Sequence, residues 1–370
     1  GGVVNNAPTA AGSGGPARMF VDMSLADAIF APRAARQLLV ARQAGQIATF
    51  NDTLLAASLA YTELVRAQDA RALADKNLKL ANKLLKLTES FEKSGKGTKA
   101  DVARVEVEVA RRRQDIVQAD LAIRVASAEL ARLLRIDMEN AGSAVRLAAK
   151  DTSLLAVDLV SPGVPLKDLI ARAVASRPEI GEADAKMFAA RANSNAEMWR
   201  PLIPNLHFGV SSGAFGGGLN DDLSQLDGRA DIDILAVWQV RNLGLGTAAA
   251  RRRAESRLRQ ANLNRGLTRD RVVADVATAY AQVQAAGEQM KIAATRVERA
   301  EDSYRKNEAR IRSLQGLPLE ALQSVTAVIE ARRGRLAAAA AYNRAQLRLL
   351  RAAGRAISAE SPTETERAPE

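Results

Sequence analysis

The sequence of 370 residues contains no cysteine and one histidine, His207. Without cysteine the chain forms no disulfide, has no thiol nucleophile and has no cysteine-ligated zinc site. A Ser-His-Asp triad would have to use His207, which lies in a Gly- and Ser-rich alternating segment. We therefore expect no catalytic residue, no cofactor-binding residue and no metal site, and we expect that the protein is not an enzyme.

Long apolar runs and proline are also scarce. No stretch of 18 apolar residues occurs, which excludes an α-helical membrane span, whereas the short alternating strands of a membrane barrel remain compatible with the sequence. No proline lies between Pro204 and Pro318, so nothing in that interval forces a helix to stop.

The chain carries a net charge of +11, from 53 Lys+Arg against 42 Asp+Glu. Such a charge permits contact with nucleic acid or with an anionic membrane, but establishes neither. Much of the excess lies in helical runs such as Arg111 to Arg113 and Arg251 to Arg253. The simplest interpretation of these runs is a set of solvated helix faces.

Two long helical segments dominate the second half of the chain, after an alternating segment. The spacing predicts a helix from about Leu245 to Leu314, roughly 100 Å long, which must pack against neighbours along its whole length. Its apolar positions step by three and four, a period typical of coiled-coil seams: Val273, Val276, Tyr280, Val283, Gly287, Met290, Ala294 and Val297, then Tyr304 and Ile311.

The same pattern occurs upstream at a constant offset. Tyr61 and Tyr280 lie in similar contexts with 280 − 61 = 219, and Gly97 and Gly316 lie in the two helix breaks with 316 − 97 = 219. Two unrelated landmarks with one offset indicate an internal duplication.

The first helical hairpin has its own signals. Helical periodicity runs from about Ala34 to Ser94, and Thr98 with Asp101 three residues later predicts an N-cap followed by an acid in the first turn. A phosphate-loop reading of Gly95 to Thr98 fails because Ser90 stands where a Walker motif needs glycine. Arg112 alone interrupts the apolar seam of the return helix, which comprises Val102, Val105, Val109, Arg112, Ile116, Ala119, Ile123, Ala126, Leu130 and Leu133.

Three segments alternate as β-strands do: Met19 to Ile29, Asn205 to Ser212 and Ala230 to Val240, the last two joined by a Gly-rich loop at Gly213 to Gly228. Ten-residue alternating strands with aromatics match membrane barrel strands, although a soluble hairpin has a similar pattern. We expect one face to meet lipid through Leu206, Phe208, Val210, Ile232, Ile234 and Trp238.

The sequence thus predicts four parts. The first repeat covers residues 1–135, with a strand region at 19–30 and a helical hairpin at 34–135, and a small equatorial section follows at 136–180. The second repeat covers residues 181–354, with a helix at 181–200, strands at 205–240 and a helical hairpin at 245–354. A disordered tail is expected at 355–370. Val3 and Val4 are a possible strand stub.

The order of these elements, given twice, resembles the TolC-type outer-membrane efflux proteins. The local matches are the Arg177-Pro178-Glu179 helix start, the turn from Pro201 to Pro204 before a strand, the strand exit from Trp238 to Gly246, and the tip Gly95-x-x-Thr98-x-x-Asp101. The resemblance covers about Met19 to Gly354.

The resemblance implies a mainly α fold with a small β part, in which duplicated long helical hairpins and two strand pairs build a trimeric α-barrel and a transmembrane β-barrel. It implies a homotrimer in the outer membrane with helices in the periplasm, acting as a passive exit duct for small molecules or proteins. The partners would be a periplasmic adaptor, an inner-membrane transporter and outer-membrane lipid, and no nucleic acid or cofactor.

The same resemblance implies site residues. The hairpin tips would dock the adaptor through Gly95, Gly97, Thr98, Asp101, Gly316 and Leu317, and Glu320 with Gln323 would line the closed gate. Leu314 and Leu317 depart from the Gly and Ser/Thr of the family's second tip, so contacts transfer less directly there. Glu320 has a second interpretation, as an acid that complements the start of its helix. The family's first half also begins with a helix and a strand, so we expect this chain to start inside that half.

Two other classes of protein stay open. A periplasmic adaptor has one helical hairpin, which disagrees with the duplication. A basic coiled-coil scaffold that binds nucleic acid accounts for the charge, but not for strand regions at matching places.

Overall fold

The computed structural model describes residues 17–137, 146–151, 153–215, 227–313 and 315–354. The predicted strand stub at Val3 and Val4, the centre of the Gly-rich loop, Leu314 and the tail at 355–370 lie outside these residues. The chain divides into two compact units, one of residues 1–46 with 178–270 and the other of residues 47–177 with 271–370.

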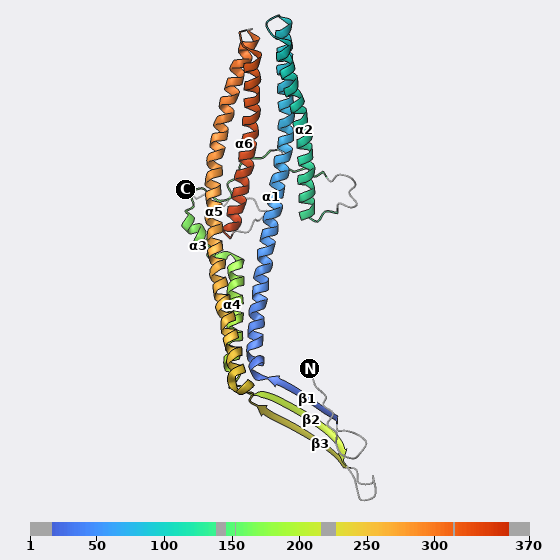
Figure 1. Cartoon of the computed structure of the whole chain (residues 1–370), viewed down its shortest axis with the longest axis vertical. Helices are drawn as coiled ribbons and strands as arrows, with labels where there is room; N and C mark the ends of the chain where they lie inside the picture. The colour runs from blue at the N-terminus through green and yellow to red at the C-terminus, as the bar shows by residue number, and fades with distance from the viewer. Residues whose placement is uncertain (1–16, 138–145, 152, 216–226, 314, 355–370) are drawn as a thin grey trace, which may run out of the picture. The chain divides into compact units, whose positions relative to one another are not determined.

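Within the described residues, the elements follow one another along the chain in a fixed order (Figure 1). They are β1 (Ala17–Ser24), α1 (Leu25–Lys93), α2 (Lys99–Leu133), α3 (Leu166–Ser176), α4 (Pro178–Trp199), β2 (Asn205–Phe215), β3 (Asp227–Val237), the 3-10 helix η2 (Arg241–Gly244), α5 (Leu245–Arg312) and α6 (Pro318–Ala352).

The element bounds agree with the predicted duplication. Helix α5 ends 312 − 93 = 219 residues after α1 ends, and α6 begins 318 − 99 = 219 residues after α2 begins. The two return helices also end at the same offset, since 352 − 133 = 219. Each repeat therefore contributes one long helix, one tip and one return helix of 35 residues.

In the first unit the strands form one antiparallel sheet in the order β1-β2-β3. Strand β2 is central, with Phe208 opposite both Val21 of β1 and Ile234 of β3. Directly opposed residues share a face, so the register places the apolar positions of all three strands together. Within the described residues, β1 and β3 are edge strands.

The boundary between the first strand and the first helix differs from the prediction. A strand was expected over residues 19–30, but β1 ends at Ser24 and α1 begins at Leu25. The Oγ atom of Ser24 accepts the backbone N–H of Asp27 at 3.3 Å, which satisfies a free donor of the first turn. Pro32 lies inside α1, upstream of the helix start expected at about Ala34. The alternation through Ile29 was accidental.

The ends of the other strands also move. Strand β2 extends to Phe215 and β3 begins at Asp227, so parts of the expected Gly-rich loop are strand. Strand β3 ends at Val237, the partner of Asn205, and Trp238 lies one residue beyond it. Pro204 precedes Asn205 and has no N–H to continue the ladder, which accounts for the earlier end.

Two apolar clusters stand out among the described residues of the second unit. One joins four helices near the tips and comprises Leu84 of α1, Val105 of α2, Ile311 of α5, and Ala321, Val325 and Ile329 of α6. The other joins α1 to α2 through Leu64, Ala67, Ile123, Ala126 and Leu130. The predicted α2 seam is buried at most positions, with Arg112 among them.

The seam of α5 lies one residue from the predicted one over part of its length. The buried positions are Val272, Val276, Ala279, Val283, Ala286, Ala293 and Val297, whereas Val273, Tyr280, Gly287 and Ala294 were expected at four of these steps. Both rows are apolar, so the period alone could not separate them. Alanine permits closer helix approach than tyrosine, which favours the row that contains Ala279.

Candidate functional site

One face of the sheet is apolar and exposed. Cross-strand pairs Val21–Phe208–Ile234 and Met19–Val210–Ile232 lie on it in rows. Ile232 and Ile234 are 77% and 68% exposed, high values for isoleucine in a strand. The predicted lipid-facing residues of β2 and β3 therefore share one face, and Trp238 continues the same alternation past the end of β3.

The opposite face of the sheet is mixed, since it carries polar residues together with Phe20, Leu235 and Val237. His207 Nδ1 contacts the carboxylate of Asp22 across the strand pair, and Asp233 lies opposite Gly209. The ring of Phe20 covers Gly209, where a Cβ atom would lie 2.9 Å from Phe20 Cε1. The single histidine thus serves a cross-strand contact. Among the described residues, no group of three or more His, Cys, Asp or Glu side chains is arranged to hold a metal ion.

The first tip has the predicted capping geometry. Gly95 adopts φ +76°, and its N–H donates to Glu92 O at 2.9 Å, so the end of α1 turns through a left-handed residue. Thr98 Oγ1 accepts the N–H of Asp101 at 3.2 Å, and an Asp101 carboxylate oxygen accepts the N–H of Thr98 at 3.2 Å. The predicted N-cap is confirmed as a capping box. The hydrogen bond from the Thr98 hydroxyl, with further support from Arg104, lowers the pKa of Asp101.

The glycines at the two breaks lack room for a side chain. A Cβ atom on Gly97 would lie 2.9 Å from Phe91 Cδ1, and one on Gly316 would lie 3.1 Å from the backbone of Arg310. Leu317 is the N-cap of α6 with no side-chain hydrogen bond, and Pro318 follows in the first turn. The second tip thus has no polar N-cap like Thr98 of the first tip, and its return helix begins with a proline instead.

The proposed gate residues lie at the start of α6. The Oε2 atom of Glu320 lies 2.9 Å from Arg310 Nη1 of α5, so its carboxylate is paired across the hairpin. Gln323 is exposed. The sequence did not predict the ion pair of Glu320 with Arg310, because it depends on how α5 packs against α6.

An ionic bridge joins α1 to α5 close to the tips. Lys83 Nζ lies 2.5 Å from Glu308 Oε1, and Arg312 Nη2 lies at the same distance. Burial alone would raise the pKa of Glu308, but hydrogen bonds from Lys83, Tyr304 and Arg312 outweigh it and lower the pKa. A carboxyl group whose pKa is lower in the folded state stabilises the fold at any pH above its unfolded-state pKa. This contribution is lost as the pH falls through the folded-state pKa.

A non-helical segment, residues 146–160 without residue 152, crosses the helices of the second unit, and we call it the strap. Gln68 of α1 donates to Leu147 O at 2.9 Å and accepts from Ala149 N at 3.2 Å. Asn343 of α6 repeats this geometry eight residues later, at 2.7 Å to Leu155 O and 3.0 Å from Val157 N. Each carboxamide thus pairs with the strap as a neighbouring strand would.

Further side chains complete the strap. Gln346, fully buried in α6, accepts from Val160 N at 3.0 Å, and Asp69 of α1 accepts from Leu154 N at 2.6 Å. Tyr342 contacts the carboxylate of Asp158. Burial, reinforced by that carboxylate, raises the pKa of Tyr342. Sequence reasoning missed these residues, and two amides at seam spacing in α6 were the available signal.

Replacing Gln346 with leucine is expected to lower the free energy of unfolding by about 1–3 kcal/mol, because the buried N–H of Val160 loses its acceptor. Amide hydrogen exchange should become faster in the strap, at Val157 and Val160 in particular. Gln118→Leu on the exposed side of α2 is the matched control. Equal unfolding energies for the two variants would contradict the role of Gln346.

No model of a known protein family and no curated relative matches the sequence. Solved structures do match. The outer-membrane channel OprN is 17% identical with a TM-score of 0.78 over 96% of this chain and 80% of that chain. The outer membrane protein VceC of Vibrio cholerae is 17% identical with a TM-score of 0.75 over 97% and 86%. The CmeC outer membrane channel of Campylobacter jejuni is 14% identical with a TM-score of 0.75 over 96% and 76%.

The chain therefore has the fold of outer-membrane channel proteins. Within that class it is the TolC-type fold, as the order of the sequence motifs predicted. None of the described helices is long and apolar enough to cross a bilayer.

Proposed function

We propose that this chain is the protomer of an outer-membrane exit duct in a tripartite efflux or type I secretion system. The observation that carries the proposal is a sheet with one continuous, exposed apolar face, in the same chain as two duplicated helical hairpins. The likeness to OprN over 96% of the chain supports it. The duct would be passive, and would cross the outer membrane with its helices in the periplasm.

Assembly of several copies follows from the physics of the sheet. A sheet in lipid cannot leave N–H and C=O groups of an edge strand without partners, since water is absent there. β1 and β3 are edge strands in the described part of the chain, so we infer that they pair with further copies. By likeness to the fold, the closed assembly is a homotrimer.

A projection image of the detergent-extracted full-length protein tests this proposal. A threefold ring on a long tube is the expected result. A monomer, or an open assembly without a central channel, would favour the alternatives of an adaptor or a coiled-coil scaffold.

We further infer that the two tips dock a periplasmic adaptor, which in turn contacts an inner-membrane transporter. The support is Gly95, where nothing in the described part of the chain lies within 4 Å of the Cβ position, so that another backbone can approach. Because the chain has no cysteine, single thiols report contacts cleanly. Lys96→Cys and Gln315→Cys, carrying a photo-crosslinker, should bind covalently to the adaptor in an assembled pump, whereas Gln118→Cys should not. A negative result at both tips in an intact pump would argue against docking there.

Glu320 is proposed to line the gate, with its charge restrained by Arg310. If the carboxylates of several copies meet at a constriction, they attract cations. In single-channel recordings, Glu320→Ala should weaken cation preference and Arg310→Ala should strengthen it by releasing the carboxylate. Glu330→Ala, an exposed acid on the same helix, is the control. Unchanged selectivity in both variants, with slightly lower stability for Glu320→Ala, would leave only the helix-start role.

A further inference from the structure

Both tryptophans of the chain lie where the sheet meets the helices. Trp199 is the last residue of α4, and Trp238 directly follows β3. The Nε1 atom of Trp238 donates to Leu202 O at 3.4 Å, which fixes the indole to the turn between α4 and β2. Tryptophan favours the boundary between the apolar core of a bilayer and the headgroups.

Apolar side chains around this junction remain exposed. Leu202, Val240, Leu243 and Leu245 are exposed beside the two tryptophans, and Leu243 is 100% exposed. Leu243 and its neighbour Asn242 also adopt left-handed φ values of 53° and 47°, which cost energy for residues other than glycine. The junction therefore exposes an apolar surface in spite of this energetic cost. We call its residues, Leu202, Val240, Leu243 and Leu245, the apolar collar.

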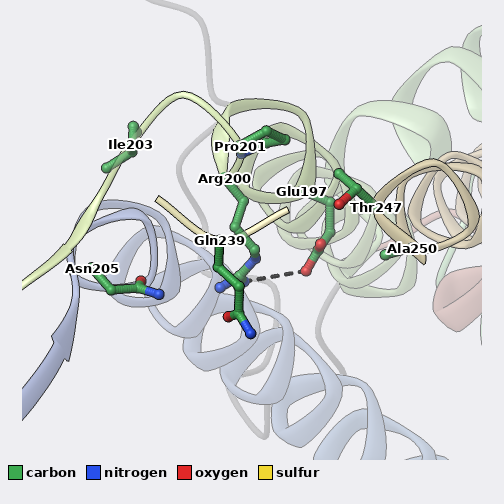
Figure 2. Close-up of a pocket in the computed structure, with 8 residues that line it drawn as sticks. All are labelled: Glu197, Arg200, Pro201, Ile203, Asn205, Gln239, Thr247 and Ala250. Carbon is green, nitrogen blue, oxygen red and sulfur yellow. Dashed lines mark ion pairs between the residues drawn. The ribbon is translucent and has the colours of Figure 1, made fainter. Parts of the chain in front are cut away.

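Ion pairs join α4 to α1 at this junction. Arg200 at the end of α4 lies 2.6 Å from Asp27 of α1 and 3.2 Å from Glu197. Figure 2 shows Arg200 and Glu197 in the hollow between the turn, the strand exit and the start of α5, lined also by Pro201, Ile203, Asn205, Gln239, Thr247 and Ala250.

A basic band follows the apolar collar. Residues 245–259 of α5 carry five arginines and one glutamate, a net charge of 5 − 1 = +4. Arg251, Arg252 and Arg253 are exposed, with Arg251 also paired to Glu255 at 3.0 Å. The first repeat has an exposed arginine at the equivalent position, since 252 − 33 = 219 places Arg33 of α1 with Arg252. We call Arg33 and Arg251 to Arg253 the arginine band.

The spacing of the two features matches a membrane boundary. Arg251 to Arg253 lie six to eight residues into α5, about 9–12 Å along its axis. The headgroup layer is about 5–8 Å deep on each side of the hydrocarbon core. Arginine side chains reach back toward such a layer while their stems lie on apolar surface.

We propose that the apolar collar and the arginine band form a binding surface for anionic phospholipid headgroups of the membrane leaflet nearest the helices. This inference rests on the proposed function, because it requires the sheet to lie in a bilayer. Guanidinium groups attract phosphate through their positive charge and bind it through N–H donors. The band carries part of the net charge of +11.

Trp199 and Trp238 provide the test, because they are the only tryptophans and lie within the surface. The full-length protein is reconstituted in vesicles that contain phosphatidylglycerol and phosphatidylcholine, with either lipid brominated in turn. Quenching of tryptophan fluorescence should show an excess of phosphatidylglycerol of about fivefold, the preference expected from one effective arginine. The excess should fall at high salt.

Matched variants separate the headgroup preference from membrane placement. The triple change Arg251→Gln, Arg252→Gln and Arg253→Gln should remove the excess, while the corresponding lysine triple should retain most of it. Lys76→Gln, Lys79→Gln and Lys86→Gln, exposed on α1, remove the same charge elsewhere and should leave it unchanged.

Two outcomes overturn the inference differently. Equal quenching by both brominated lipids, or an excess that survives the glutamine triple, rejects the lipid surface and leaves the membrane duct intact. Absence of quenching by either lipid places the junction outside the bilayer and rejects the proposed function together with this inference.

Discussion

Replacement of Arg112 by methionine should lower the free energy of unfolding by about 3–5 kcal/mol, because it leaves the buried carboxylate of Glu108 without its cation. The Arg112 side chain is 4% exposed, with Nε 3.0 Å from Glu108 Oε1 and Nη1 2.9 Å from Asp115 Oδ2. Asp115 also contacts Arg333 of α6, so the cluster joins the return helices of the two repeats.

Denaturant unfolding of the full-length protein measures this effect. Arg113→Met, an exposed neighbour with the same charge change, is the control and should alter the unfolding energy by less than about 0.5 kcal/mol. Adding Glu108→Leu to Arg112→Met should restore part of the loss, since one uncompensated carboxylate disappears. Equal effects of Arg112→Met and Arg113→Met would show that the buried cluster contributes nothing.

Substitution of Ile234 by arginine should prevent assembly in the outer membrane, at a cost of about 2–4 kcal/mol per copy near the bilayer midplane. Ile234 is exposed on the apolar face, opposite Phe208. The neighbouring change Asp233→Arg places the same side chain on the other face, opposite Gly209, and should permit assembly.

The amount of heat-modifiable protein in outer-membrane fractions reports the difference between these two variants. Because they differ by one position in a strand, local strand propensity and expression are closely matched. Assembly of Ile234→Arg with loss of Asp233→Arg would mean that the polar face meets lipid, and would reverse the proposed orientation of the sheet.

Residue order alone was sufficient for features that depend on local periodicity. The two helix breaks, the 219-residue offset and the N-cap at Thr98 followed by Asp101 all follow from spacing, because each is decided within a few residues or by self-similarity. The alternation of Phe208 and Ile234 likewise predicted a shared face, since side chains on a strand alternate with a period of two.

Only the tertiary structure decided features for which the local sequence fits two structures equally well. The hydroxyl of Ser24 ends β1 although alternation continues, and Ala279 rather than Tyr280 enters the seam although both rows are apolar. The ion pair of Glu320 with Arg310 and the amide contacts of Asn343 with the strap join residues distant in sequence. Their partners depend on which helices lie together and in what register, and the repeat period does not contain that information.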